Sequence, residues 1–275
     1  MGGATTVGSS DPAIPVVIVV SIVFVVVCAS LVALVHSGMR GPEAIARRRR
    51  ANPTQPWLWR DDWATRRVRE QSPRQSATIV FALMWCAIAF SLAYMRGWHF
   101  PNDPDAAISL LFAAIGVIFL GRAAYSMLRR RKFGRSICEI DRLPIEPGQT
   151  FSGTIEHRGA QTPDDGYQLV LSCLDRVVTR RVNRQRPQVD DTVLWNAEQR
   201  VSAALAAPSS AGMRVPFSFA IPADALPSQS RRTNERVLWQ LAVSAELPGI
   251  DYNATFELPV FNPANSASSP APARS

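Results

Sequence analysis

The sequence predicts membrane α plus all-β architecture, with three transmembrane helices followed by one antiparallel β-sandwich. Three observations lead to this prediction. The first 128 residues contain three long apolar stretches. After Phe133 the chain changes to short segments in which apolar and polar side chains alternate. The charge divides at the same border: residues 1–132 carry 16 Lys or Arg against 7 Asp or Glu, a net of +9, and residues 133–275 carry 14 against 15, a net of −1.

The first apolar stretch is residues 14–36, which follows a small and polar amino terminus, residues 1–13. It contains 23 residues and no charge. A helix of this length crosses a hydrocarbon core of ~30 Å at a rise of about 1.5 Å per residue. A cleaved signal peptide has a basic region before a shorter core, and both features are missing here. The stretch therefore predicts a transmembrane helix.

The Arg/Trp-rich loop, residues 37–76, holds ten arginines against four acids, which is typical of a cytoplasmic loop. It contains the sequence PWLWRDDWA, residues Pro56–Ala64. Tryptophan favours the membrane interface, so one interpretation places this segment on the lipid headgroups. The alternative is a contact surface for the β domain or for a partner. The candidate interface residues are Trp57, Trp59, Arg60, Asp61, Asp62 and Trp63.

Two further apolar stretches, residues 77–95 and 106–128, predict the second and third transmembrane helices, so that the transmembrane region covers residues 14–128. The third stretch reaches Leu128 only if Arg122 extends its guanidinium toward the interface. A basic cluster follows the third stretch and is predicted to hold its end at anionic headgroups. The predicted membrane-anchoring residues are Arg122, Arg129, Arg130, Arg131 and Lys132.

The distribution of basic residues predicts an orientation. Lys and Arg number zero before the first stretch, ten after it, one after the second and five directly after the third. The positive-inside rule then places the amino terminus outside and the carboxyl-terminal domain in the cytoplasm. The predicted location is the bacterial inner membrane, crossed several times.

The segment from residue 133 to residue 261 is predicted to be a β-sandwich, and the Ser/Ala/Pro-rich tail 262–275 to be disordered. Turn sequences such as Glu146-Pro147-Gly148 separate the strands. The predicted strands are Ser136–Asp141, Gln149–His157, Gln168–Arg180, Thr192–Ala203, Met213–Ile221, Val237–Glu246 and Tyr252–Val260.

Two of these strands alternate strictly, which predicts the side chains of the core. In the first strand, one face carries Val215, Phe217, Phe219 and Ile221. In the second strand, one face carries Val237, Trp239, Leu241 and Val243. Burying each large apolar side chain stabilises the fold by roughly 1.5–3 kcal/mol. We therefore interpret these aromatic residues as structural and not as a ligand-binding cage.

Several phrases in this half resemble the amino-terminal domain of arrestins. They are the Pro147-Gly148 turn followed by Gly153, the sequence from Gly212 to Pro222, and the strand Trp239–Val243. Features of the whole chain, including PWLWRDDWA, resemble the uncharacterised bacterial membrane proteins grouped as DUF3592. The resemblance implies an arrestin-like, immunoglobulin-like sandwich that binds proteins and has no catalytic residues. The chain departs from arrestins in having one sandwich instead of two.

The residues offer little for catalysis, so the chain is predicted not to be an enzyme and to need no cofactor or metal. His36, His99 and His157 fall in different parts of the predicted topology, and no metal-ligand or nucleophile motif is present. The four cysteines, Cys28, Cys86, Cys138 and Cys173, are interpreted as small buried side chains in a reducing compartment. The arginines near Arg176 alternate with acids, which argues against nucleic-acid binding.

The leading functional hypothesis is a non-enzymatic integral membrane protein. Its cytoplasmic sandwich would act as a protein-interaction scaffold or as a subunit of a membrane complex. The predicted partners are the lipid bilayer and a protein at the cytoplasmic face, in a homo- or hetero-oligomer, with no nucleic acid. The first alternative is an immunity protein that protects the membrane from a toxin. The second is a component of a transporter or an enzyme.

Overall fold

The computed structural model describes residues 44–71, 81–86, 88, 104–159, 161–179, 188–210, 212–232 and 234–262. The chain divides into two compact units, residues 1–41 with 73–127 and residues 42–72 with 128–275. The elements in chain order are η1 (Pro56–Leu58), α2 (Asp61–Ala64), β1 (Arg67–Arg69), α4 (Pro104–Phe133), β2 (Ile137–Ile140), β3 (Thr150–His157), β4 (Tyr167–Thr179), β5 (Gln188–Val201), η2 (Ala203–Leu205), β6 (Ala207–Ser209), β7 (Gly212–Ala220), β8 (Gln229–Arg232), β9 (Glu235–Ala245) and β10 (Tyr252–Leu258).

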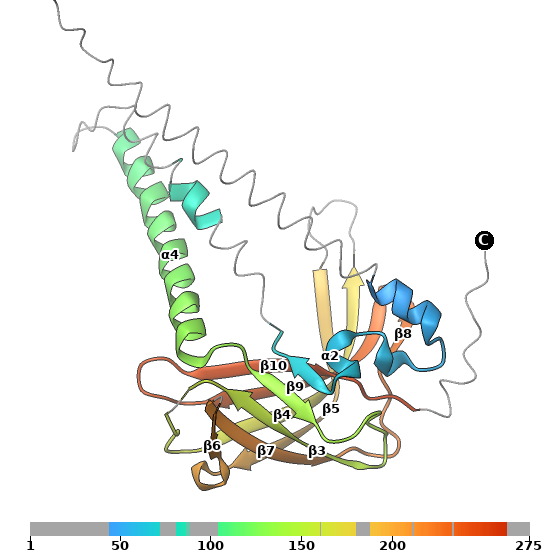
Figure 1. Ribbon diagram of the computed structural model, residues 1–275. Helices are drawn as coiled ribbons and strands as arrows, with labels where there is room; N and C mark the ends of the chain where they lie inside the picture. Colours follow the sequence, from blue (N-terminus) through green and yellow to red (C-terminus); the bar gives the residue numbers. More distant parts are fainter. Residues whose placement is uncertain are drawn as a thin grey trace, which may run out of the picture. The chain divides into compact units, whose positions relative to one another are not determined.

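The second unit is built from two five-stranded antiparallel sheets (Figure 1). One sheet has the order β1-β2-β3-β7-β6, and the other has the order β10-β9-β4-β5. In the second sheet β8 and β10 share one side of β9, since β10 pairs with residues 239–245 and β8 with residues 235–237. Its other side pairs with β4.

The core lies between the two sheets and confirms the predicted inward faces. The strictly alternating residues of β7 and β9 are at most 4 % exposed, and Trp239 and Leu241 are fully buried. Aromatic rings pack within this layer, with Phe151 and Phe217 centred 5.5 Å apart and Trp195 and Trp239 5.4 Å apart. Apolar burial of this kind is the main stabilising contribution to a sandwich.

All seven predicted strands are present, as β2, β3, β4, β5, β7, β9 and β10. The sequence did not predict β1, β6 and β8, each of which has three or four residues. A strand this short has too few residues to show a period of two. β1 is the most informative of the three, because it comes from the Arg/Trp-rich loop and joins the sandwich as an edge strand.

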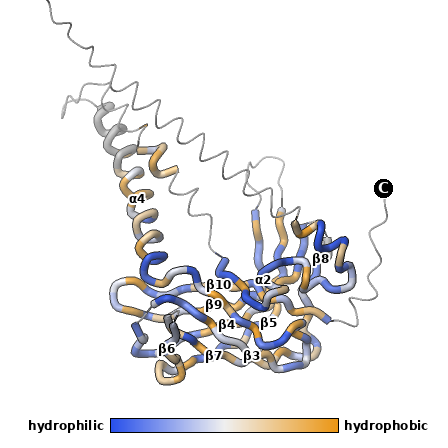
Figure 2. The backbone as a smooth tube through the Cα atoms, in the orientation of Figure 1, coloured by the Kyte–Doolittle hydropathy of each residue, from blue (hydrophilic) through white to orange (hydrophobic). Residues whose placement is uncertain are grey.

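In the first unit, α4 packs against a helical segment at residues 81–86. The rings of Phe81 and Phe119 are 5.1 Å apart, and a Cβ added at Gly116 would lie 3.0 Å from Cys86 Sγ. Away from this contact α4 is apolar and exposed, and hydrophilic residues appear at its carboxyl end (Figure 2). The large exposed side chains are Leu111, Val117, Ile118, Leu120, Tyr125 and Met127.

The prediction of three transmembrane helices is wrong. Residues 14–36, and most of 77–95, lie outside the described residues. Among the helices of the described ranges, none combines the length and the apolar character that a membrane crossing requires. α4 carries Asp105 and Arg122, which leave 16 uncharged residues between them, about 24 Å of helix against a hydrocarbon core of ~30 Å. The third span depended on continuing the helix past Arg122.

This finding also overturns the predictions that were derived from the three spans. They are the multi-pass inner-membrane location, the outside amino terminus and the cytoplasmic assignment of the β-sandwich. The prediction of a β-sandwich does not depend on the spans, because it rests on the alternation of residues after Phe133. The sandwich is present in the structure as two antiparallel sheets.

Candidate functional site

The segment Pro56–Gln71, called here the strap, folds back onto the sandwich from the middle of the Arg/Trp-rich loop. Pro56 opens the single turn η1, and Asp61 and Asp62 occupy the first turn of α2, where carboxylates favour the helix amino terminus. Arg66 then adopts a left-handed conformation with φ of 57°, and its backbone N–H donates to Trp63 O at 2.9 Å. This turn ends α2 and directs the chain into β1.

Backbone hydrogen bonds make the strap part of both sheets. β1 pairs antiparallel with β2, from Arg67 opposite Glu139 to Arg69 opposite Ile137. Beyond β1, Glu70 N–H donates to Ser136 O at 3.1 Å and Gln71 N–H donates to Thr255 O at 2.8 Å. β1 is the outermost strand of the first sheet and β10 of the second, and the strap bonds to both sheets there, so it closes this edge of the sandwich (Figure 1).

Trp63 is the apolar anchor of the strap. Its side chain is 8 % exposed, and its indole Nε1–H donates to Glu257 O of β10 at 3.0 Å. Its ring meets Phe261 edge-on at 5.8 Å, and Trp57 packs on the same phenyl ring at 6.2 Å. Trp63 therefore extends the core out to the strap, and a single hydrogen bond fixes its orientation.

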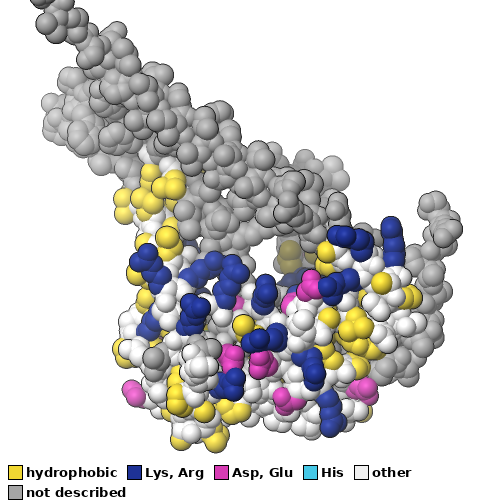
Figure 3. Space-filling view, viewed as in Figure 1, with side chains coloured by type: hydrophobic (Ala, Val, Ile, Leu, Met, Phe, Trp, Pro, Cys, Tyr) yellow, Lys and Arg dark blue, Asp and Glu magenta, His cyan; other side chains and the backbone are white. Residues whose placement is uncertain are grey.

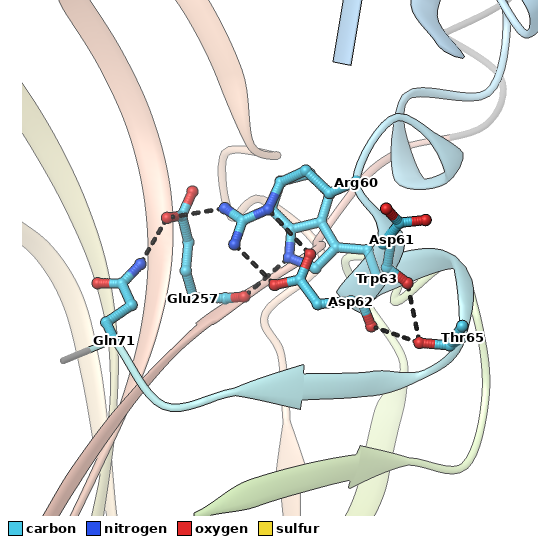
Figure 4. A network of polar contacts seen from close by, with 7 residues as sticks. All are labelled: Arg60, Asp61, Asp62, Trp63, Thr65, Gln71 and Glu257. Carbon is cyan, nitrogen blue, oxygen red and sulfur yellow. Dashed lines mark hydrogen bonds and ion pairs between the residues drawn. The ribbon is translucent and has the colours of Figure 1, made fainter. Parts of the chain in front are cut away.

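A charged network around Arg60 lies beside this anchor (Figure 4). Arg60 Nη2 is 2.7 Å from Asp62 Oδ2, and Arg60 Nη1 is 3.1 Å from Glu257 Oε2. Gln71 Nε2 donates to the same Glu257 oxygen at 2.6 Å. The guanidinium also stacks 4.4 Å from the centre of the Trp63 ring. Glu257, which is 8 % exposed, thus receives an ion pair and a hydrogen bond from the strap.

The structure therefore brings together most of the residues singled out in PWLWRDDWA, and it places them against β10. Asp61 lies at the rim, where it pairs with Arg48. The Trp59 indole donates to Asn52 O at 2.7 Å, and its ring lies under Arg49. The sequence did not identify Glu257, the acid at the centre of the network, because nothing near it along the chain marks it as a partner of residue 60.

The predicted anchoring residues at the end of α4 make contacts within the β unit. Lys132 Nζ donates to Pro248 O at 2.9 Å and Ile250 O at 3.1 Å, and Arg129 lies 3.6 Å from Glu70. Arg122 and Arg131 are exposed. Gly134, with φ of 67°, ends the helix by donating its N–H to Arg130 O, a conformation that favours glycine.

A buried aromatic cluster lies where α4 enters the sandwich. Phe133 is 3 % exposed and meets the rings of Tyr252 and His157 edge-on, while His157 stacks on Tyr252 at 4.3 Å. Gly159 N–H donates to His157 Nδ1, so that nitrogen carries no proton, and Nε2–H donates to Tyr167 Oη at 3.0 Å. Tyr252 Oη bonds Ser136 Oγ at 3.0 Å.

This burial shifts the proton equilibria of the cluster. It lowers the pKa of His157 to about 4 and raises the pKa of Tyr167 to about 12. Burial also raises the pKa of Tyr252 above its usual value, against the opposing effect of the hydrogen bond to Ser136. His157 is therefore a neutral structural side chain at neutral pH, with both ring nitrogens hydrogen-bonded.

Charged side chains also cross-link the first sheet on its outer surface. Arg67 of β1 lies 2.9 Å from Glu139 of β2 and 3.7 Å from Glu156 of β3, and Arg214 of β7 pairs with Glu156. Figure 3 shows basic and acidic side chains next to one another on the face in view. This row spans four neighbouring strands and binds them laterally.

The opposite edge of the second sheet is formed by β5, which pairs with β4 alone in the described part of the chain. The register shifts between Cys173 and Leu174, so Leu194 has no counterpart on β4 and forms a bulge. On the Val201 side of the bulge, Trp195 and Ala197 pack against the core. On the other side, residues 188–194, called here the open edge, are all exposed, including Val189 at 51 % and Val193 at 57 %.

The described residues hold no group of three or more His, Cys, Asp or Glu side chains arranged for a metal ion. The described cysteines Cys86, Cys138 and Cys173 are thiols that form no disulfide, and burial raises the pKa of Cys138. Cys28, His36 and His99 lie outside the described residues.

Comparison with known proteins leaves the family open. No protein-family model matches the chain, including any for the DUF3592 group, and no curated protein matches it. Among solved structures, the sporulation control protein Spo0M from Bacillus subtilis, a β-sandwich protein, is 16 % identical with a TM-score of 0.31. The match covers 46 % of this chain and 49 % of Spo0M, so it spans about half of that protein.

Two other solved structures show weaker likeness. A β-glucosidase from Listeria innocua is 16 % identical over 46 % of this chain and 16 % of its own, with a TM-score of 0.19. The alkylpurine DNA glycosylase AlkC from Pseudomonas fluorescens is 14 % identical over 67 % and 47 %, with a TM-score of 0.14. None of these likenesses defines the function of this chain.

Proposed function

We propose that this chain is a non-catalytic scaffold whose arrestin-like β-sandwich binds another protein. The observation that carries the proposal is the open edge of β5, residues 188–194. Within the described residues this stretch pairs on one side only, and its apolar side chains face solvent. An unpaired strand edge is a template for strand addition, and proteins usually protect such edges. Binding of an extended segment as an added strand uses this template.

The chemistry of the open edge defines the kind of segment that fits it. Arg176 of β4 makes two hydrogen bonds of 2.6 Å to the Asp191 carboxylate, so these charges neutralise one another. Val189 and Val193 stand on either side of Asp191 on the same face of β5, because side chains alternate along a strand. The edge therefore fits an extended segment with alternating apolar residues better than a highly charged one.

The use of charged side chains elsewhere supports a role without catalysis. Glu257 is paired within the strap, Glu156 holds Arg67 and Arg214, and His157 is locked in a buried aromatic stack. Each of these groups links structural elements through its charge or hydrogen bonds. Such a use is expected of residues that stabilise a sheet, whereas catalytic groups are aimed at a substrate site.

The test is affinity purification of the full chain from its native cells, comparing Val193→Lys with Leu205→Lys. Both changes place lysine at an exposed apolar position, but Leu205, 62 % exposed, lies in η2 and outside β5. Lysine on an edge strand blocks strand addition. We expect the amount of co-purified partner to be at least tenfold lower with Val193→Lys and unchanged with Leu205→Lys. Equal retention by both variants would contradict the proposal.

A further inference from the structure

The strap contacts the sandwich in the way that an extended peptide binds to a sheet. β1 adds to the edge of β2 through main-chain pairing, and Gln71 N–H donates to β10. The side chain of Trp63 is buried and packs on Phe261. Arg60 reaches the Glu257 carboxylate at 3.1 Å (Figure 4). In strand addition, main-chain hydrogen bonds supply affinity and such side-chain anchors supply specificity. The strap therefore makes the contacts of a bound ligand.

The pairing of the strap is short compared with that of the central strands. β1 pairs with β2 over three residues, whereas β3 pairs with β7 over eight and β4 pairs with β9 over ten. Segments that hold few backbone hydrogen bonds at a sheet edge open at a lower free energy than the interior of the sheet. We therefore expect the strap to open more readily than these strands.

Arg66 gives the strap a strained backbone conformation. Its φ of 57° is the one positive value at a non-glycine residue in the described part of the chain. The left-handed region is unfavourable for residues that carry a Cβ, and such strain persists only while surrounding contacts impose it. Here Arg66 Nη1 donates to Asp141 O at 3.0 Å, and Ile140 N–H donates to Arg66 O at 2.9 Å. Release of the strap relieves this strain, which favours opening.

We propose that the strap is a displaceable ligand of its own sandwich, and that an extended segment of another protein takes its place. The strap defines what that segment carries. It has an arginine, a tryptophan three positions later and a small apolar residue five positions after that, as in Arg60, Trp63 and Val68. Val68 is fully buried, so a charged side chain is excluded from its place. Glu257 is only 8 % exposed, so its carboxylate selects a positive charge opposite it.

A segment of another protein fits this site better than the strap of a second copy. Exchange between two copies would place the same arginine, Arg66, in the left-handed turn, so the strain would remain. A segment with glycine at that position adopts the turn without strain. The strap site, formed by the edges of β2 and β10 with Phe261, lies at the other edge of the second sheet from β5. The inference therefore does not rest on the binding proposed at β5.

The experiment measures binding of a labelled peptide, with the sequence of residues 56–71, to the full-length protein by fluorescence anisotropy. The resident strap competes with the peptide, so the apparent affinity decreases when less of the protein has a released strap. The protein variant Trp63→Ala weakens the resident strap, whereas the control Trp59→Ala leaves its buried anchor in place. We expect the peptide to bind Trp63→Ala at least tenfold more tightly than the wild-type protein or Trp59→Ala.

A second pair of measurements tests the selection of arginine. On the Trp63→Ala protein, a peptide with Arg60→Gln should bind at least fivefold more weakly than the unmodified peptide. On protein that also carries Glu257→Gln, the two peptides should bind within twofold of one another, because the carboxylate that selects arginine is gone. If circular dichroism shows that Trp63→Ala does not fold, the protein variant Arg60→Gln weakens the resident strap in its place.

Three results would overturn the inference. One is equal affinity of the peptide for the wild-type protein, Trp63→Ala and Trp59→Ala. Another is the absence of binding to every folded variant, which would make the strap a permanent part of the sandwich. The third is a dimer of the wild-type protein that the peptide converts to monomers in size-exclusion chromatography. That result would assign the strap site to the strap of a second copy.

Discussion

The two edges of the second sheet are treated in opposite ways. At β10 the strap adds a hydrogen bond from Gln71 to Thr255, the buried indole of Trp63 and the ion pair from Arg60 to Glu257. At β5, residues 188–194 carry no such cover among the described residues, and a bulge at Leu194 turns the strand. One edge is closed by the strap, and the other is exposed within the described part of the chain.

Under the proposed function, this difference would limit uncontrolled association at one edge and leave the other edge for binding. The strap, which precedes the β-sandwich in the sequence, forms hydrogen bonds with backbone groups of β2 and β10. Another chain can therefore pair with β2 or β10 at this edge only if the strap is displaced. At β5 the bulge limits the pairing surface to one short stretch. Substitutions at the closed edge should therefore affect stability, and substitutions at the open edge should affect binding.

The largest effect is expected from Trp63→Ala at the closed edge. The change removes a large buried side chain and leaves Glu257 O without its indole donor, at an expected cost of about 3–5 kcal/mol in the free energy of unfolding. Urea denaturation followed by intrinsic fluorescence measures it. Trp59→Ala serves as the control, because Trp59 is only half-buried and bonds within the loop to Asn52. A loss for Trp63→Ala no larger than that for Trp59→Ala would show that the strap is not an integral part of the fold.

The next effect is a pH dependence that originates in His157. Its pKa in the folded state, about 4, lies below the unfolded value of 6.5, so the unfolded chain binds more protons between these pH values. The contribution of neutral His157 to the free energy of unfolding is fully present above pH 6.5. It decreases by about 3 kcal/mol in total as the pH falls to about 4. Denaturation curves between pH 7 and pH 4 measure the slope.

The variant His157→Phe isolates this contribution. Phenylalanine keeps the aromatic stack on Tyr252 but has no proton to gain, although it leaves Gly159 N–H and Tyr167 Oη without their partner. We expect a less stable protein at pH 7 whose stability depends less steeply on pH between 6.5 and 4. The same slope in both proteins would assign the pH dependence to other groups.

A smaller effect is expected from Glu257→Gln, which keeps the shape of the side chain and removes its charge. Arg60 then keeps Asp62 but loses its ion pair with residue 257, and the expected loss is about 1–3 kcal/mol. A double-mutant cycle with Arg60→Gln measures the coupling between the two residues. A coupling energy near zero would mean that burial of Trp63, and not this ion pair, holds the strap.

The sequence predicted the parts of the fold in which local pattern and final position agree. Val215, Phe217 and Phe219 alternate with polar residues, and their faces are buried as expected, because a period of two leaves a strand only one way to bury apolar side chains. The strap could not be predicted in this way. Trp57 and Trp63 pack against Phe261, which lies far away along the chain, and the three residues of β1 are too few to show a period.

The incorrect prediction of the third transmembrane helix has a specific cause. Apolar length was counted through Arg122, although the uncharged part of α4 spans only 16 residues between Asp105 and Arg122. The basic cluster was then interpreted by its charge alone. In the structure Lys132 bonds two backbone carbonyls of the loop between β9 and β10, and Arg129 pairs with Glu70. Charge composition does not distinguish such contacts from an interface with anionic headgroups.

The smallest effect on stability is expected at the open edge, where Val193→Lys tests the comparison most directly. Val193 is 57 % exposed, so a lysine there keeps its ammonium in water and should change the free energy of unfolding by less than about 0.5 kcal/mol. The same substitution at Val68 of β1, which is fully buried, places a charge in the core and should cost several kcal/mol. Denaturant unfolding of both variants measures the contrast. A large loss of stability for Val193→Lys would mean that another part of the chain covers β5. Both edges of the second sheet would then be closed.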